Sequence, residues 1–200
     1  MPAPKLKALQ HIALKVRDLE VSLKFYVEVL GFRVIERHAG GELASRPHGL
    51  NFITCTNLHH VMNLAELGAE FRPKDPPPPM NTLANPVFGL HHFAFEVEDR
   101  AEYDAWQKHL AEQGVEIVHG PLVHSPTHPE GDGSWGENRA MYFCDPDGNA
   151  VEIFCDMGVM DENGEYDREW FADRLRRDGH DPTGISPVET GKFKGRPQPV

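Results

Sequence analysis

The chain has 200 residues, of which 40% are hydrophobic and 26% charged, and its formal net charge at pH 7 is −11. This length suits one domain or two small modules, and the composition is that of a soluble globular protein. The negative charge argues against nucleic acid and anionic membrane as partners, and no apolar run approaches the length of a membrane span. The three cysteines form no close motif, and their odd number favours a reducing compartment, so we expect a cytoplasmic protein.

The first third of the chain predicts a βαβββ module. Residues 9–16 alternate as a strand that carries His11 and Ala13 on the face opposite its aliphatic residues. Asp18 is placed to cap a helix and Gly31 to end it. The remaining strands are expected at residues 32–36, 50–56 and 61–67.

The same pattern returns in the second half of the chain. Residues 90–97 predict a strand that aligns with the first one and places His92 at the position of His11. A helix follows and ends near Gly114. After it we expect a strand at residues 115–118, a long loop rich in Gly, Pro and His, and a final hairpin.

The repeat predicts a duplicated α+β chain built from two βαβββ modules. A stretch with four consecutive prolines separates the copies and is typical of a linker. The end of the chain is polar and contains one expected helix. The predicted segments are a first module at 7–67, a Pro-rich linker at 68–89, a second module at 90–156 and a polar C-terminal tail at 157–200, with its helix at Tyr166–Arg177.

The final hairpin contains an unusual carboxylate. Its two strands, in residues 139–154, are joined by the turn Asp145–Asn149, and Glu152 falls in the middle of the second strand. An ionised carboxylate there is costly unless it is paired or bound to a metal. With His11 and His92, it would make the two-imidazole, one-carboxylate set that leaves open positions on Fe(II), and Mn(II) accepts the same donors. The alternative is an exposed strand edge with two half-buried histidines satisfied by the backbone.

These motifs resemble the vicinal oxygen chelate superfamily and, within it, the type I extradiol ring-cleaving (catechol 2,3-dioxygenase-like) dioxygenases, in a compact single-domain form. The resemblance covers about residues 7–156 and implies that the modules pair into a half-open barrel, the glyoxalase/extradiol dioxygenase fold. The motifs that carry it are Leu9-Gln-His11, Phe25–Phe32, Leu58-His-His-Val61, Leu90-His-His-Phe93, Gly120–His124 and Tyr142–Glu152.

The resemblance also implies the site residues and the reaction. His11, His92 and Glu152 would hold the metal, with Fe(II) as the expected metal and Mn(II) as the other metal that suits these donors. The substrates would be O2 and a catechol-type aromatic diol, whose ring opens to a semialdehyde-type product. A homo-oligomer, a dimer or higher, is expected from the family.

Three further residues take the acid–base and substrate-side roles of the family. His59 would be the acid–base group, since it is the first histidine of its pair and not His60 that matches. His124 and Tyr142 would hydrogen-bond the substrate. Catalysis would therefore involve His59, Tyr142 and His124.

The chain departs from the family pattern between His124 and Tyr142. Residues Thr127–Trp135 look inserted, so His119 or His128 could replace His124. We predict that this insertion and the tail together cover the mouth of the metal pocket. We expect a compact form with a single pair of modules, without the additional N-terminal pair found in many family members.

Two other functions use the same fold. A glyoxalase-like isomerase or a transferase would need a carboxylate from the first module, for which Glu66 is the candidate. A metal-free ligand-sequestering protein would leave the three metal-type ligands unexplained.

Overall fold

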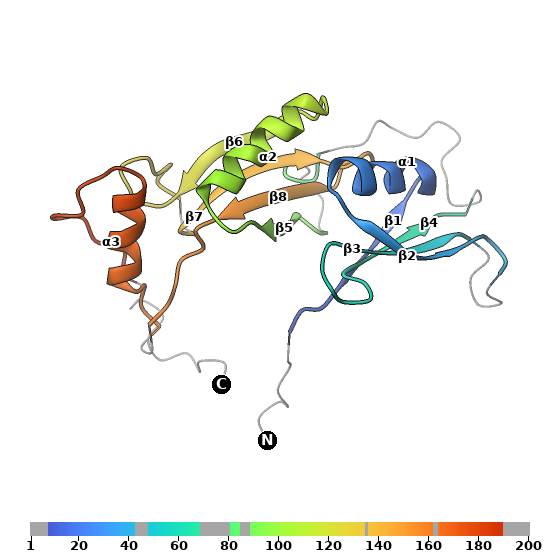
Figure 1. The fold of residues 1–200 in the computed structure, drawn as a ribbon, viewed down its shortest axis with the longest axis horizontal. Coiled ribbons are helices and arrows are strands. Elements are labelled where there is room, and N and C mark those ends of the chain that lie inside the picture. Colours follow the sequence, from blue (N-terminus) through green and yellow to red (C-terminus); the bar gives the residue numbers. More distant parts are fainter. Residues whose placement is uncertain are drawn as a thin grey trace, which may run out of the picture. The chain divides into compact units, whose positions relative to one another are not determined.

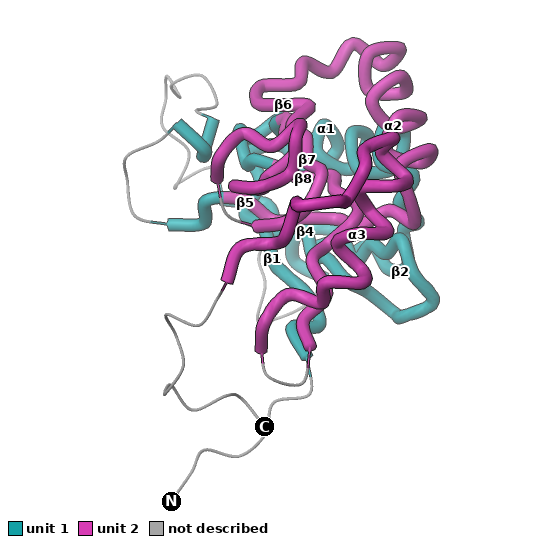
Figure 2. Tube along the Cα trace, turned by 90° about the vertical axis from the view of Figure 1, so that its left-hand side faces the viewer, with its two compact units in different colours: residues 1–91, 144–150 teal, residues 92–143, 151–200 magenta. Residues whose placement is uncertain are grey.

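The computed structural model describes residues 8–42, 48–68, 81–84, 89–134, 136–161 and 164–189. Most of the predicted linker, including its four prolines, and Trp135 of the insertion lie outside these residues. The chain divides into two compact units (Figure 2). Unit 1 contains residues 1–91 and 144–150, and unit 2 contains residues 92–143 and 151–200.

Unit 1 forms the first predicted βαβββ module. Its strands form one mixed sheet in the order β1-β4-β3-β2, in which only the β1–β4 pairing is parallel (Figure 1). Strand β1 begins three residues later than predicted, so that His11 precedes the strand. The elements are β1 (Ile12–Val16), α1 (Leu19–Lys24) with a π-helical turn (Phe25–Val29), β2 (Arg33–His38), β3 (Leu50–Thr54) and β4 (Met62–Glu66).

The predicted helix start is confirmed at Asp18. Its carboxylate accepts the backbone N–H groups of Glu20 and Val21 at 3.0 and 3.1 Å, which satisfies two of the donors that a helix start leaves unpaired. The helix and the turn that continues it bury Leu23 and Tyr26. These side chains, with the aliphatic face of β1, form the apolar core of the unit.

The turn of the final hairpin, residues 144–150, belongs to unit 1. The phenol of Tyr26 donates a 2.9 Å hydrogen bond to Asp145, and the hydroxyl of Ser22 donates one of the same length to Asp147. The backbone N–H of Arg17 also donates to Asp147. Burial raises the pKa of Asp145, while hydrogen bonds from Asn149 and Tyr26 oppose that rise. The turn predicted from its Pro and Gly residues is therefore also a buried polar anchor.

Unit 2 repeats the module and adds a C-terminal helix. Its strands form a second four-stranded sheet in the order β5-β8-β7-β6, with α2 along one face (Figure 1). Helix α2 buries Tyr103 and Leu110, and Asp99 caps its start. The elements are β5 (His92–Glu96), α2 (Arg100–Glu112), β6 (Ile117–His124), β7 (Asn138–Cys144), β8 (Ala150–Cys155) and α3 (Arg168–Arg177).

Strand β6 corrects one expectation. The segment after residue 118 was predicted to be a loop because it contains Gly120 and Pro121, but the strand continues to His124. It is the outer strand of its sheet, and its register with β7 shifts on both sides of His119. Proline lacks the N–H that a central strand needs, yet an edge strand with irregular register tolerates it.

The tail helix α3 begins two residues later than predicted, because Asp167 caps it. Tyr166 lies before the helix and pairs with Met160 in an isolated bridge, so the expected aromatic stripe is shorter. Phe171 and Arg174 are fully buried. The guanidinium of Arg174 lies 3.3 Å from the Glu137 carboxylate, and neither side chain is exposed. None of the described helices is long and apolar enough to cross a bilayer.

We predict that Arg174→Met lowers the free energy of unfolding by about 3–5 kcal/mol, because it leaves the buried Glu137 carboxylate without a counter-charge. Urea unfolding measures the change. The matched control is Arg176→Met, two residues further along the same helix. The ion pair of Arg176 with Asp173 is exposed, so the expected change is below about 1 kcal/mol. Equal effects of the two substitutions would contradict a docked α3.

Candidate functional site

The buried carboxylate predicted from the sequence is present on β8. Glu152 is only 4% exposed, and its Oε2 lies 3.1 Å from Nε2 of His92. His92 begins β5, the strand next to β8 in the sheet. The sheet order therefore brings together two residues that are far apart in the sequence, and it pairs an imidazole with a carboxylate.

The second oxygen of Glu152 is held by a side chain that the sequence analysis did not identify. Nδ2 of Asn138, the first residue of β7, donates to Oε1 of Glu152 at 3.1 Å. The amide oxygen of Asn138 is buried and has no hydrogen-bond partner. An unsatisfied buried acceptor beside a buried carboxylate is costly without a donor or cation, so this corner of unit 2 is suited to a positively charged ligand.

The donor chemistry of this corner fits a divalent metal. Imidazole nitrogen and carboxylate oxygen are the ligand types of non-haem Fe(II) and Mn(II) sites. Among the residues that the structure describes, no three His, Cys, Asp or Glu side chains already form a metal cage. His11 lies in unit 1, and its place in the ligand set stays a prediction.

Tyr142 and His124 form a hydrogen-bonded pair in unit 2. The Tyr142 hydroxyl and Nε2 of His124 are 3.0 Å apart, and the Tyr142 ring contacts His92 edge-on at 5.4 Å between centroids. Burial, and then the negative charge of Glu152, raise the pKa of Tyr142. The phenol is therefore protonated throughout the physiological pH range and is available as a hydrogen-bond donor.

The sequence left open whether His119 or His128 replaces His124. His119 stands opposite Tyr142 in the sheet and only packs its ring against it, with centroids 5.5 Å apart. His128 is buried elsewhere, with Nε2 at 3.1 Å from Asp178 beyond the end of α3. Of the three histidines, His124 is the one at hydrogen-bond distance from the phenol.

The described part of the insertion, residues 127–134, supplies two residues that sequence analysis missed. Nδ1 of His124 lies 3.1 Å from a carboxylate oxygen of Asp132 and 2.7 Å from the hydroxyl of Ser134. Both residues look like ordinary loop residues in the sequence. No local signal marks them, because their partner precedes them by eight and ten positions and lies on a strand.

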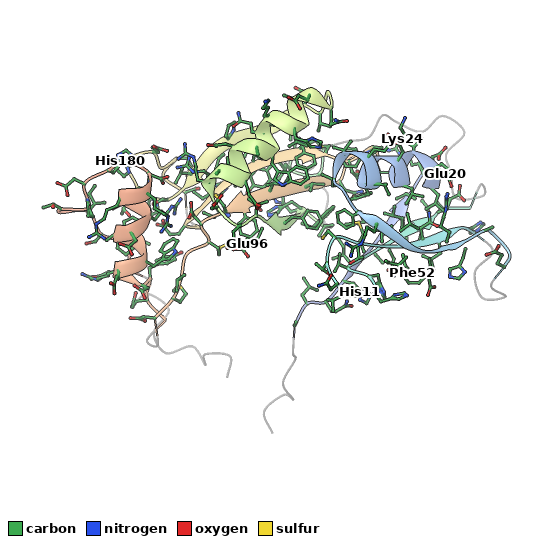
Figure 3. All side chains as sticks on the ribbon, in the orientation of Figure 1. His11, Glu20, Lys24, Phe52, Glu96 and His180 are labelled. Atoms are coloured by element: carbon green, nitrogen blue, oxygen red, sulfur yellow. The ribbon has the colours of Figure 1, made fainter. Side chains whose placement is uncertain are left out.

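The insertion and the tail also contact each other. Asp178 accepts from Arg139 and faces His128, and Glu130 lies 3.1 Å from His180. Burial opposes ionisation of Asp178, but its contacts with His128 and Arg139 outweigh burial and lower its pKa far below the ordinary value. Figure 3 labels His180 near α3. That the two segments cover a pocket mouth stays a prediction.

In unit 1, His59 and its neighbours form an exposed cluster. Nε2 of His59 lies 2.9 Å from Glu36, and its Nδ1 lies 2.9 Å from Nδ1 of His60. The His60 ring contacts the His11 ring at 4.8 Å between centroids. Partial burial and the charges of His11 and His59 lower the pKa of His60. His60 is therefore the histidine whose ring contacts His11, while His59 is the one paired with a carboxylate, and the acid–base role of His59 stays a prediction.

This cluster lies on one side of the unit 1 sheet. Figure 3 shows His11 and Phe52 on the side opposite Glu20 and Lys24 of α1. Phe52 contacts the rings of both His59 and His60. Phe52 therefore supports the two histidine rings, and the His59 side chain is exposed to solvent.

Glu66, the carboxylate that an isomerase would need, lies far from His11. It pairs with Val16 at the opposite end of β1. Five residues at about 3.3 Å of rise per residue place it roughly 16 Å from His11 along the strand. The residue next to the His11 end of β1 is Val61, which precedes β4 and whose carbonyl accepts the N–H of Ile12.

Comparison with known proteins identifies the family of this fold. Residues 8–153 match the model of the Glyoxalase/Bleomycin resistance protein/Dioxygenase superfamily. The chain therefore belongs to this superfamily, which is the predicted one. A glyoxylase/bleomycin resistance protein/dioxygenase domain from Frankia sp. EAN1pec has a TM-score of 0.55 at 20% identity over 76% of this chain and 99% of that chain, which supports the βαβββ fold.

Two relatives extend the comparison. A catechol-2,3-dioxygenase of Bacillus subtilis (strain 168) is 31% identical over 72% of this chain, and a glyoxalase domain-containing protein, RDO1, of Mycosarcoma maydis is 28% identical over 74%. The matched region of the chain spans 39% of the length of the Bacillus protein and 68% of the Mycosarcoma protein. Dioxygenases and glyoxalase-type proteins are thus both among its relatives.

We predict that His92→Ala and Glu152→Ala each abolish retention of a divalent metal while unfolding remains cooperative. The reason is that His92 and Glu152, 3.1 Å apart, are the two neighbouring metal-type donors of unit 2, and each substitution removes one of them. Metal content after gel filtration measures it. His119→Ala, in the same unit and beside Tyr142, is the control and should keep the metal. Near-stoichiometric metal in either ligand variant would remove that residue from the site.

Proposed function

We propose that the protein is a metal-dependent extradiol dioxygenase that opens the ring of a catechol-type substrate with O2. The observation that carries the proposal is the pairing, within unit 2, of the His92–Glu152 contact with the Tyr142–His124 hydrogen bond. The first supplies metal-type ligands, and the second supplies a phenol donor and a histidine. An isomerase has no need for the second pair.

The proposed ligand set is His11, His92 and Glu152, with Fe(II) as the expected metal and Mn(II) as the other metal that suits these donors. When bound, such a metal stabilises phenolate oxygens of a catechol and leaves a position for O2, so that both reactants are held together. In the metal-bound protein, His92 would exchange its contact with Glu152 for the metal. Asn138 would continue to orient the Glu152 carboxylate through Oε1.

His59 is proposed to move the second phenol proton. An imidazole suits this role because its ordinary pKa lies near neutral pH. Glu36, 2.9 Å from Nε2 of His59, would fix the orientation of the ring. Glu36 also accepts from His38, and the hydrogen bond from His38, followed by that from His59, lowers the pKa of the Glu36 carboxyl. Glu36 is therefore ionised at the working pH of the histidine.

Tyr142 and His124 are proposed to act on the substrate side. The protonated phenol of Tyr142 can donate to an oxygen of the substrate or of the ring-opening intermediate. His124, at 3.0 Å from that phenol, would hold its orientation. The likeness to a catechol-2,3-dioxygenase over 72% of this chain supports this reading.

A glyoxalase-like isomerase or transferase is the second candidate, and the glyoxalase-type relative supports it. Its requirement for a carboxylate beside His11 counts against it, because Glu66 lies about 16 Å along β1. A metal-free binding protein would not explain why a carboxylate, Glu152, is buried beside His92. Metal content and oxygen uptake separate the three.

We expect anaerobically purified protein loaded with Fe(II) to consume O2 when a catechol is added. An oxygen electrode measures uptake against a panel of catechols with different ring substituents. Mono-methylated catechols are the control, because one oxygen can no longer lose its proton and bind as a phenolate. Metal-replete protein that consumes no O2 with any of the catechols, and that isomerises a hemithioacetal, would favour the second candidate.

The adjacent histidines provide a sharper kinetic prediction. His59→Phe should retain metal and bind catechol but lose about 10²-fold or more in kcat, which is the usual effect of losing a positioned acid–base group. His60→Phe is the matched control, since it keeps the His59–Glu36 contact. A loss of kcat confined to His60→Phe would transfer the acid–base role to the histidine that contacts His11.

A further inference from the structure

The hydrogen bonds around His124 determine where its ring carries a proton. The hydroxyl of Ser134 donates to Oδ1 of Asp132 at 2.6 Å, so that its oxygen is left as an acceptor towards His124. Nδ1 of His124 thus faces two acceptors, this hydroxyl at 2.7 Å and Oδ2 of Asp132 at 3.1 Å. A lone pair on Nδ1 would be repelled by both. Nδ1 is therefore the protonated nitrogen.

The other ring nitrogen then becomes an acceptor. Neutral imidazole carries one N–H, so a proton on Nδ1 leaves a lone pair on Nε2. The Tyr142 hydroxyl lies 3.0 Å from Nε2 and donates to it. Glu152 is also within reach of the phenol, but with a lone pair on Nε2 of His124 the 3.0 Å contact is a hydrogen bond only if the phenol is its donor.

Asp132 is held in place by the backbone of β6. Its N–H donates to the carbonyl of Val123 at 2.9 Å, and Gly131 forms a parallel bridge with Val123. A side chain at Gly131 would collide with the Ser125 carbonyl, so the loop can fold back this closely only with glycine there. The neighbouring turn is fixed as well, because the Ser125 hydroxyl accepts the N–H of His128 at 2.9 Å.

The carboxylate of Asp132 is ionised at neutral pH. Burial opposes ionisation, but hydrogen bonds from Ser134 and His124 outweigh it and lower the pKa of Asp132. An ionised Asp132 can only accept hydrogen bonds. This agrees with the proton on Nδ1 of His124.

We propose that Asp132 and Ser134, both in the inserted loop, are positioning residues that lock His124 as the Nδ1–H tautomer, with Nε2 accepting from Tyr142. The consequence for turnover rests on the proposed dioxygenase function, whereas the tautomer itself does not. The inserted loop would then orient His124 through Nδ1, the ring nitrogen that faces away from Tyr142. This differs from a lid, which would act by contacting the substrate.

Nitrogen-15 NMR of the histidine side chains tests the tautomer directly. Long-range proton–nitrogen correlations of the full, metal-free chain at about pH 8.5, well above the ordinary range for histidine, distinguish Nδ1–H from Nε2–H rings. The signal of His124 is assigned by its loss in His124→Gln. We expect the pattern of an Nδ1–H ring in the wild type and an Nε2–H or mixed pattern in the double variant Asp132→Ala/Ser134→Ala.

The controls separate positioning from loop stability. Glu130→Gln removes a carboxylate from the same loop, but one that contacts Arg139 and His180 rather than His124, and it should leave the tautomer unchanged. Ser134→Thr keeps a hydroxyl and should also preserve it. With the best catechol, the double variant should lose about 10²-fold in kcat with its metal content and KM nearly unchanged, and Ser134→Thr should keep most of the wild-type kcat.

The outcomes are distinct. An Nε2–H ring in the wild type, or an Nδ1–H ring that survives in the double variant, would overturn the proposal. An Nδ1–H ring that depends on Asp132 and Ser134 supports it, even in a protein that consumes no O2 with catechols. In that case the dioxygenase assignment fails and the positioning role stands.

Discussion

A carboxylate in the middle of an apolar strand is the constraint around which unit 2 is arranged. Glu152 cannot remain ionised and buried on β8 without compensating groups. His92 and Asn138, from the two strands that flank β8, supply an imidazole and an amide donor at 3.1 Å each. The strand order is thus what makes the buried charge tolerable, and the same order presents metal-type ligands together.

A second layer of polar contacts supports this sheet from the tail. Glu137, one residue before β7, is buried against Arg174 of α3 and accepts from Ser125 at the end of β6. His128 and Arg139 converge on Asp178. The C-terminal helix and the insertion are therefore structural parts of unit 2. Through Asp132 they also reach His124, the partner of Tyr142.

Those features that depend on local pattern or on the repeat could be predicted from the sequence. Asp18 is a cap because its carboxylate reaches the next turn, and His11 and His92 match because the two modules align. Glu152 stood out because a charge interrupts an apolar strand. The sequence could not choose among His119, His124 and His128 as the partner of Tyr142. The structure places His124 at hydrogen-bond distance from the phenol and His128 beside Asp178.

The features that were missed arise from contacts between distant segments. Asn138, Asp132 and Ser134 are ordinary polar residues in sequence, and only tertiary structure gives them partners. The extension of β6 through Pro121 was missed because the rule against proline in strands applies to central strands, whereas β6 is an edge. The burial of Arg174 was not predicted, because nothing local marks one arginine of a polar tail as the partner of a distant buried carboxylate.

The central claim is that the His92–Glu152 corner and the Tyr142–His124 pair serve ring cleavage by O2. Mass spectrometry of the product formed under ¹⁸O2 tests it most directly, with the aldehyde reduced at once to prevent exchange of its oxygen with water. The account predicts a ring opened beside the diol that carries two ¹⁸O atoms. A product without ¹⁸O, or with the ring intact, would contradict it.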